Sequence, residues 1–480
     1  MDTKKLRQKI LDLAIRGKLV PQDPNDEPAS VLLERIRAEK EQLIKEGKIK
    51  RSKKSAASDT SHYENVPFEV PEGWAWCRLE DIAYVAAGST PSKESFVENG
   101  VPYIKMYNLR NQKIDFEFHP QYITEEVHNN KLARSRTQPG DLLMNIVGPP
   151  LGKLAIIPES LPEANFNQAA VLIRPFKFKP AITQYLFYYL SELSEINSIS
   201  TKGSAGQVNI SLTQSQQMRI ALPPLAELER ITQKIESLFS KIGVLETSID
   251  NIYDHISKIK SGILEKALSG KLVSQDKTDE PAITLLKSIN PDFEPTDNRH
   301  YENIPLKWEE CALKDIVEIQ NGFAFKSSLY SNDGVRVIRI TNVQDGYIVD
   351  DSPKYYPLSL MTGLDDYILE ENDLLMSLTG NVGRVAMMTA SLLPAALNQR
   401  VCCITPKSSE VCKEFLFYLL RTDSFITSCI ESGKGVAQLN VSTEWLKSYR
   451  IALPPKDEQR RIVKAIQNIM TKIDKILADL

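Results

Sequence analysis

Apolar residues recur at steps of three and four between positions 228 and 263, with polar residues between them. This stripe comprises Leu228, Ile231, Ile235, Leu238, Ile242, Leu245, Ile249, Ile252, Ile256, Ile259 and Ile263. The spacing places these side chains on one face of an α-helix, in a heptad pattern. Pro223 and Pro224 suit the first turn, Glu227 and Glu229 complement the positive end of the helix dipole, and Gly270 is a plausible end. Such a helix would be on the order of 60 Å long, so it needs a partner helix.

The two ends of the chain carry the same pattern and predict that partner. The stripe continues in Ile462, Ile466, Ile469, Ile473, Ile476 and Leu480, while Leu6 and Ile10 occupy the positions of Ile259 and Ile263. We expect the central helix to pair antiparallel with a helix that is split between the two termini. The alternative is a heptad helix that only makes a homodimer.

The chain also contains itself twice. Ile220–Pro224, Glu227, Arg230 and Ile231 return as Ile451–Pro455, Glu458, Arg461 and Ile462, and Gly17–Val20, Gln22, Asp23 and Asp26–Ala29 return as Gly270–Val273, Gln275, Asp276 and Asp279–Ala282. The C-terminus ends at the repeat position where the N-terminus begins, so the repeat is cyclic. Such a repeat suggests a pseudo-two-fold molecule, suited to a two-fold-related target such as duplex DNA.

Two globular segments lie between the helical parts. Both contain short β-like stretches, followed by one helix rich in aromatic residues, at 185–190 and at 415–420, whose spacing favours a core position over a base-stacking surface. The fold class is therefore α+β, with two similar mixed α/β domains joined by a long antiparallel coiled-coil pair. The expected segments are 1–44 (helical), 45–65 (a basic and then serine-rich linker), 66–222 (first module), 223–270 (central helix), 271–303 (linker), 304–453 (second module) and 454–480 (C-terminal helix).

Composition and net charge limit the classes of function that the chain could have. The 480 residues carry a net charge of -3, which argues against a stand-alone nucleic-acid binder because phosphate neutralisation supplies most non-specific affinity. Any DNA role needs a partner that contributes positive surface. The six cysteines show no Cys-x-x-Cys spacing and favour buried reduced thiols. With no secretory apolar core and no apolar run near the roughly 20 residues of a membrane span, we expect a cytoplasmic protein.

The sequence offers no convincing catalytic set. Gly152-Lys153 and Gly433-Lys434 lack the following Ser or Thr of a nucleotide-binding loop. Asn290–Phe293 only approaches an amino-methyltransferase motif, and the five histidines show no metal-ligand spacing. We therefore expect a protein that is not an enzyme.

These features together resemble the specificity subunit of type I restriction-modification systems. The resemblance rests on the cyclic repeat, the Leu-Pro-Pro entries at 222–224 and 453–455, and the pair Gln207–Ser211 and Gln438–Ser442. It implies two target-recognition domains, each reading one half of a bipartite DNA sequence. It also implies helical regions that set their spacing and hold two methyltransferase subunits, with restriction/translocase subunits as further partners. S-adenosylmethionine, ATP and magnesium are then expected in the partner subunits and no cofactor in this chain.

Base edges in the major groove are read by Arg or Lys toward guanine and by Asn or Gln toward adenine. Residues identical in both modules, such as Asn167-Gln168 and Asn398-Gln399, are expected to maintain the fold or contact phosphates, whereas specificity should lie where the copies differ. The glycine-bounded segments 202–206 and 433–437 are candidate phosphate loops. The candidate DNA-binding residues are Lys105, Tyr107, Arg110, Lys131, Arg134, Arg136, Lys153, Lys202, Ser204, Gln207, Lys326, Arg336, Arg339, Arg384, Arg400, Lys434 and Gln438.

Two other classes of function stay open. A coiled-coil scaffold could bind two proteins without DNA readout, which the nearly neutral charge favours and the divergence of polar loops between similar modules opposes. An enzyme with an unrecognised site comes last. For each single candidate residue, a solvated surface charge is the alternative interpretation.

Overall fold

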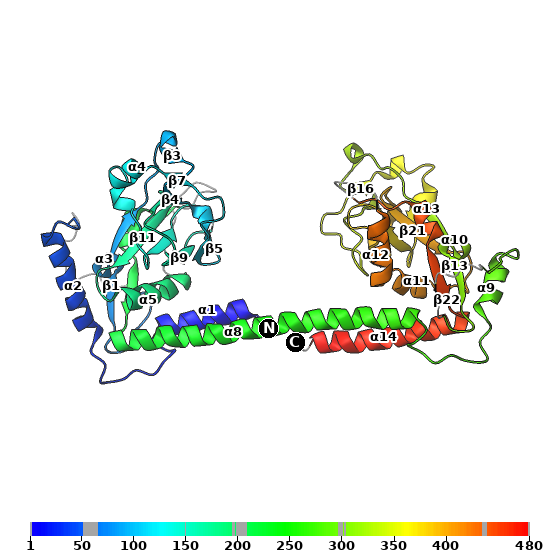
Figure 1. Cartoon of the computed structure of the whole chain (residues 1–480), viewed down its shortest axis with the longest axis horizontal. Helices are drawn as coiled ribbons and strands as arrows, with labels where there is room; N and C mark the ends of the chain where they lie inside the picture. Colours follow the sequence, from blue (N-terminus) through cyan, green and yellow to red (C-terminus); the bar gives the residue numbers. More distant parts are fainter. Residues whose placement is uncertain are drawn as a thin grey trace. The chain divides into compact units, whose positions relative to one another are not determined.

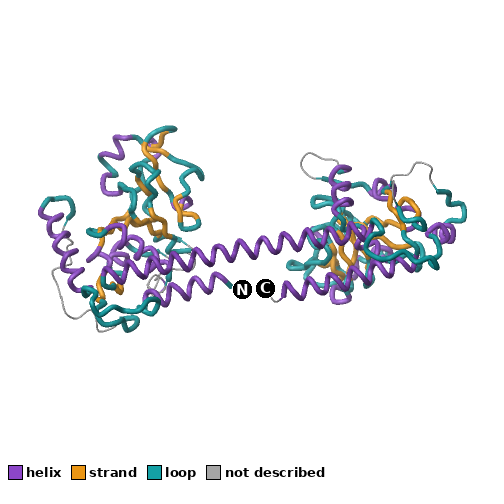
Figure 2. The backbone as a smooth tube through the Cα atoms, turned by 60° about the horizontal axis from the view of Figure 1, so that its bottom comes forward, coloured by secondary structure: helices purple, strands orange, loops and turns teal. Residues whose placement is uncertain are grey.

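The computed structural model describes residues 2–50, 66–148, 150–193, 197, 209–295, 301, 304–433 and 439–478 (Figure 1). The chain forms two compact units, Met1–Thr247 and Ser248–Leu480. The boundary falls inside α8 (Leu225–Leu268), one helix of 44 residues. In each unit the strands lie within a globular module and the long helices run outside it (Figure 2).

The first unit builds its module from two four-stranded sheets. One is antiparallel, in the order β2 (Ala83–Ala87), β11 (Ala170–Pro175), β8 (Leu142–Asn145) and β9 (Leu154–Ile156). The other has the order β10 (Asn165–Phe166), β4 (Val101–Ile104), β7 (Tyr122–Ile123) and β3 (Phe96–Val97), with β10 parallel to β4. A small hairpin joins β5 (Leu109–Arg110) to β6 (Lys113–Ile114). The helices are α1 (Thr3–Ile15), α2 (Ala29–Lys45), α3 (Leu79–Ile82), α4 (Glu125–Asn129), α5 (Lys179–Ser191) and α7 (Leu212–Gln216).

The second unit repeats this plan. Its sheets are β14 (Val317–Asn321), β21 (Val401–Pro406), β18 (Leu374–Ser377) and β19 (Val385–Met387), and β16 (Tyr355–Tyr356), β15 (Val335–Ile338), β20 (Ala395–Leu397) and β17 (Ile368–Leu369). Its helices are α9 (Ala282–Ile289), α10 (Leu313–Ile316), α11 (Lys413–Leu419), α12 (Asp423–Ser432), α13 (Thr443–Ser448) and α14 (Lys456–Ala478). The predicted mixed fold with two similar modules is confirmed.

The first and last strands of each module pair with each other. β1 (Ala75–Arg78) is antiparallel to β12 (Arg219–Leu222), and β13 (Glu309–Ala312) is antiparallel to β22 (Arg450–Leu453). The chain therefore enters and leaves each module side by side, next to the start of a long helix. This arrangement lets a module be inserted between helical segments without disturbing their pairing.

Both helix pairs are antiparallel, as the sequence predicts. In the first unit Arg7 forms an ion pair with Glu246 at 2.9 Å, while Gln22, beyond the end of α1, donates to Glu227 at 3.0 Å. The partner residue on α8 therefore comes earlier in the sequence as the residue at the N-terminal end of the chain comes later, which defines an antiparallel pair. Figure 1 shows α1 beside the first part of α8.

The second unit has the same arrangement. Lys260 of α8 pairs with Asp474 of α14 at 2.7 Å, and Gln275 donates to Glu458 at 2.6 Å. Gly270, with φ +68°, follows the end of α8 at Leu268, which confirms the predicted stop.

The apolar stripe of α8 is fully buried near its first turns and partly exposed along its middle. Ile231 and Ile235 are fully buried, but Leu245, Ile252 and Ile259 are 40%, 37% and 54% exposed. α1 begins about one turn before Arg7, which pairs with Glu246, and α14 ends about one turn after Asp474, which pairs with Lys260, so Ile252 lies beyond the described ends of both partner helices. Leu245 and Ile259 are next to the paired residues and are still partly exposed.

The remaining core predictions hold. In the aromatic-rich helices Tyr185, Tyr189, Phe415 and Leu416 are buried, so these side chains are core rather than a base-stacking surface. All six cysteines are unpaired and five of them are buried.

A buried carboxylate lies at the start of each long helix. Glu227 is 1% exposed; its two oxygens accept hydrogen bonds from Trp74 Nε1 at 2.9 Å and from Gln22 Nε2 at 3.0 Å. One turn later Arg230 donates two bonds to Asp26, at 3.2 and 2.6 Å. We name these five residues the hinge network. The network joins α8, the segment after α1 and Trp74, the residue that directly precedes the first strand of the module.

The second unit repeats most of this network, but Trp308 Nε1 and Glu458 Oε2 do not form the hydrogen bond that joins Trp74 to Glu227. Gln275 donates to Glu458, which is fully buried, and Arg461 donates two bonds to Asp279, at 3.0 and 2.6 Å. Burial raises the pKa of Glu458 above its usual value, against the opposing effect of its hydrogen-bond donors. The repeated sequence motifs are therefore the residues of a polar network, and Glu227, predicted only to complement the helix dipole, is also a buried acceptor of two side-chain hydrogen bonds.

Replacement of Glu227 by alanine removes the acceptor of a buried indole N–H. An unsatisfied buried donor costs about 1–3 kcal/mol, so Glu227→Ala should lower the free energy of unfolding by at least that amount. Chemical denaturation of the purified chain measures the change. Glu229→Ala is the matched control, because Glu229 lies in the same helical turn and is exposed. Equal stability of the two variants would show that the hinge network contributes nothing.

A comparison of Gly17 with Gly47 distinguishes the cost of a positive φ angle from the cost of a steric clash. A Cβ at Gly17 (φ +65°) would lie 2.3 Å from Pro71 Cγ, whereas Gly47 (φ +71°) has nothing within 4 Å of the same position. We expect Gly47→Ala to destabilise by about 1–2 kcal/mol through its φ angle alone. Gly17→Ala should cost about 1–3 kcal/mol more because the helix end must move away from the module. Equal losses in thermal unfolding would contradict the close approach.

Candidate nucleic-acid interface

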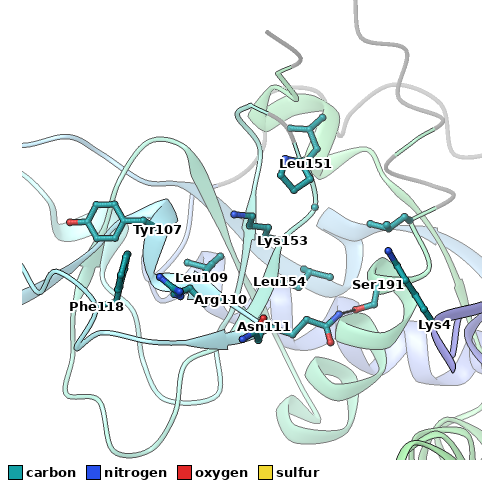
Figure 3. Close-up of a pocket in the computed structure, with 14 residues that line it drawn as sticks. Lys4, Tyr107, Leu109, Arg110, Asn111, Phe118, Leu151, Lys153, Leu154 and Ser191 are labelled. Atoms are coloured by element: carbon teal, nitrogen blue, oxygen red, sulfur yellow. Dashed lines mark hydrogen bonds between the residues drawn. The ribbon is translucent and has the colours of Figure 1, made fainter. Parts of the chain in front are cut away.

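A pocket of about 830 Å³ opens on the first module (Figure 3). Its walls come from the β5–β6 hairpin, the turn before β9, the end of α5 and the start of α1. The pocket brings the predicted residues Tyr107 and Arg110 together with Lys153, which is distant in sequence, and adds Lys4. Three cationic side chains around an open hollow form a surface that suits an anionic ligand such as a nucleic-acid backbone.

The hairpin that carries Arg110 is anchored by a buried asparagine. Asn108 is 1% exposed; its Oδ1 accepts from Lys105 N at 2.8 Å. Its Nδ2 donates to the carbonyl oxygens of Asp115 at 3.0 Å and Phe118 at 2.8 Å. One side chain therefore fixes both ends of the loop on which the pocket residues lie. Sequence reasoning did not select Asn108, although it recurs as Asn342 at the same distance after Ile104 and Ile338.

Cations and aromatic rings gather along this loop. The guanidinium of Arg110 lies 3.9 Å from the ring centroid of Phe118, and Lys105 Nζ lies 5.3 Å from that of Phe96. Tyr107 donates its hydroxyl to His119 O at 3.1 Å. Burial raises the pKa of Tyr107, so this phenol stays protonated at neutral pH.

Lys153 lies on a tight turn between β8 and β9. Asn145 Nδ2 donates to Pro150 O at 2.9 Å, while Lys153 N donates back to Asn145 Oδ1. Gly148 (φ +80°) and Gly152 (φ +73°) supply left-handed backbone that other residues rarely adopt. The exposed Lys153 side chain is thus carried by a well-braced turn.

The second module has a smaller pocket, of about 440 Å³, at the corresponding turn. Arg384 takes the position of Lys153 but donates to Gln344, and Arg421 donates to Asp345 at 2.7 Å. The two pockets therefore differ in charge pattern on the same framework: the cations of the second are paired with protein groups. Arg421 and Asp345 were not selected from the sequence, because nothing in their local pattern shows that the fold brings them together.

Three other predicted arginines are held inside their modules. Arg136 donates to Asn129 Oδ1 at 2.7 Å. Arg336 forms an ion pair with Asp350 at 2.7 Å, and Arg339 donates to Ser352 O at 3.0 Å. Each guanidinium thus has a bracing role in the free protein.

The remaining predicted residues lie at the surface or outside the described part of the chain. Lys131, Arg134, Lys326 and Arg400 are exposed. Lys202, Ser204, Gln207, Lys434 and Gln438 fall outside the residues that the structure describes. As DNA contacts, all of the candidate residues stay predictions.

Two negative findings concern the residues that the structure describes. Across these ranges no cluster of three or more His, Cys, Asp or Glu side chains could hold a metal ion. None of the helices there has the length and apolar character that crossing a membrane requires.

Comparison with known proteins adds the family. The model of the type I restriction modification DNA specificity domain matches residues 71–253 and 305–478. The EcoAI specificity subunit of Escherichia coli is 30% identical over 539 residues, covering 98% of this chain and 90% of the relative. The EcoEI specificity subunit of Escherichia coli is 28% identical over 562 residues, with the same shares covered.

A solved chain supports the fold. It comes from work on the assembly and conformational transition of a type I restriction-modification system, with a TM-score of 0.56 and 17% identity, and the match covers 85% of this chain and 93% of the solved one. Because the family model matches one region in each unit and together most of the chain, the chain belongs to the type I restriction-modification DNA specificity family.

Proposed function

We propose that this chain is the DNA-recognition subunit of a type I restriction-modification complex, that it carries out no catalysis itself, and that it reads a bipartite target. Its module at 66–222 would read one half-site and its module at 304–453 the other. One observation carries the proposal: the two modules share topology and anchoring residues but differ in the side chains of their pockets. Asn108 and Asn342 anchor equivalent loops, whereas Arg110 and Gln344 follow them.

The readout follows from groove chemistry. Exposed cations on rigid turns position the duplex through its phosphates, while side chains that differ between modules contact base edges in the major groove. Lys153 on its braced turn fits the first role, and the divergent residues of the hairpin loop fit the second. A net charge of -3 is compatible with this role if partner subunits supply further positive surface.

The helical segments 1–44, 223–270 and 454–480 would form the scaffold for those partners. We propose two methyltransferase subunits and restriction/translocase subunits, with S-adenosylmethionine, ATP and magnesium bound by them. In the second unit, the part of α8 with Ile252 and Ile259 supports a docking role, because these apolar side chains are 37% and 54% exposed.

The same exposed stripe favours a second candidate, a scaffold that binds two proteins without reading DNA. The two candidates differ in one outcome. A scaffold without readout leaves the choice of methylated sequence to other subunits, so replacing a module would change no base of the target.

Exchange of residues 66–222 for the equivalent span of a relative tests the proposal. We expect one half of the methylated sequence to change, with the other half and the spacer retained, because each module is a separate unit of sheets and loops. Methylome sequencing of cells that carry the chimera and its methyltransferase measures this. Altered bases in both halves would contradict the one-module-per-half-site model, and an unaltered target would favour the scaffold.

Removal of one phosphate contact should weaken binding without changing the sequence that is read. We expect Lys153→Ala in the assembled complex to lower the slope of log affinity against log salt by about 0.9. The loss should be the same on specific and unrelated duplexes. Lys234→Ala, an exposed lysine on α8, is the control and should leave the slope unchanged. A normal slope for Lys153→Ala would exclude the proposed contact.

A further inference from the structure

The arginines among the candidate residues differ in what already engages their guanidinium groups. Arg136, Arg336, Arg339 and Arg384 each donate from a terminal nitrogen to a protein acceptor. An arginine in this state must give up a protein bond before it can contact a base. Arg110 is held in a different way.

Arg110 contacts the protein through one face of its guanidinium and through one long ion pair. Its guanidinium stacks over the Phe118 ring at 3.9 Å, and its Nε faces Asp115 Oδ2 at 3.7 Å (Figure 3). Neither terminal nitrogen donates a hydrogen bond to any residue within the described ranges. The residue is exposed at the mouth of the pocket, so a fork of two N–H donors faces solvent in a held orientation.

The two groups that hold Arg110 are fixed by a single buried side chain. Asn108 Nδ2 donates to the backbone carbonyls of both Asp115 and Phe118. Asp115 N also donates to Asn108 O at 2.8 Å. Asn108 therefore fixes the backbone from which Asp115 and Phe118 reach Arg110, and these contacts restrict the guanidinium before a ligand arrives, which reduces the entropy lost on binding.

The second module keeps the anchor and changes the presented residue. Asn342 Nδ2 donates to Val349 O at 2.8 Å and to Asp350 Oδ1 at 3.1 Å. Gln344 takes the place of Arg110, and its Oε1 accepts from Arg384. An invariant anchor with a different side chain at its tip is what two modules need to read different bases.

Resting on the proposed function, we propose that Arg110 reads a guanine in the half-site of the first module. Its two terminal nitrogens donate to N7 and O6 of that base in the major groove, a bidentate pairing for which the planar guanidinium fork has a fixed geometry. Phe118 and Asp115 are positioning residues: they hold the guanidinium and contact no base.

Replacement of single guanines by 7-deazaguanine tests this assignment, because it removes only the N7 acceptor and keeps Watson–Crick pairing. In the assembled complex of full-length chain and methyltransferase, the original protein should lose on the order of tenfold or more in affinity at one guanine of the first half-site. Arg110→Ala should abolish the penalty at that position alone, and Arg110→Lys should retain part of it, because an ammonium group can still donate to N7. Penalties in the second half-site should be unchanged.

The positioning residues and a control cation complete the design. Phe118→Leu should reduce the penalty at the same guanine, and Phe118→Tyr, which keeps the ring, should restore it. Lys179→Ala removes an exposed cation of the same module that is not among the candidate residues, and it should leave the whole pattern intact.

The failures of the two proposals are distinguishable. If Arg110→Ala keeps every 7-deazaguanine penalty of the original protein, the guanine assignment is wrong while the bipartite function stands. A first half-site in which no guanine shows a penalty has the same meaning. If the methylome of the original complex shows no bipartite target, the proposed function itself fails.

Discussion

The buried carboxylate at the start of each long helix is the interaction on which the rest of the architecture depends. Glu227 and Glu458 lie where burial is costly, and the donors of neighbouring segments offset that cost. Because Trp74 comes from the module and Gln22 from the segment after α1, the helix pair and the module are fixed to one another within the unit. This shared requirement explains why the residues of the network recur with nearly the same spacing in both copies.

Within each module, the residues that stabilise the loops are different from the residues that are proposed to read DNA. Asn108 and Asn342 satisfy the backbone of equivalent loops, and neither side chain is exposed. The side chains at the loop tips are then free to differ without loss of fold. The first module presents cations at an open pocket, whereas the second pairs Arg384 and Arg421 with protein acceptors. Two sites of different chemistry thus arise on one framework.

Periodicity and repetition predict those parts of the structure that follow from local sequence. The heptad stripe predicts α8 and its antiparallel partners, and the aromatic spacing predicts core helices. The exposed middle of α8 was not predicted, because the reach of α1 and α14 depends on where the helices pair. The state of each candidate arginine also depends on tertiary contacts that the sequence does not show. Arg336 is paired by Asp350 and Arg110 is stacked by Phe118, and no spacing rule distinguishes these two arginines.

The central claim is that two modules of one chain read two separate half-sites. The most direct measurement is the methylome of cells in which this chain and its methyltransferase are the sole source of a new methylation. We expect one methylated target with two short specified parts, separated by a spacer of fixed length and unspecified sequence. A single uninterrupted target, or methylation that persists when this chain is deleted, would contradict it.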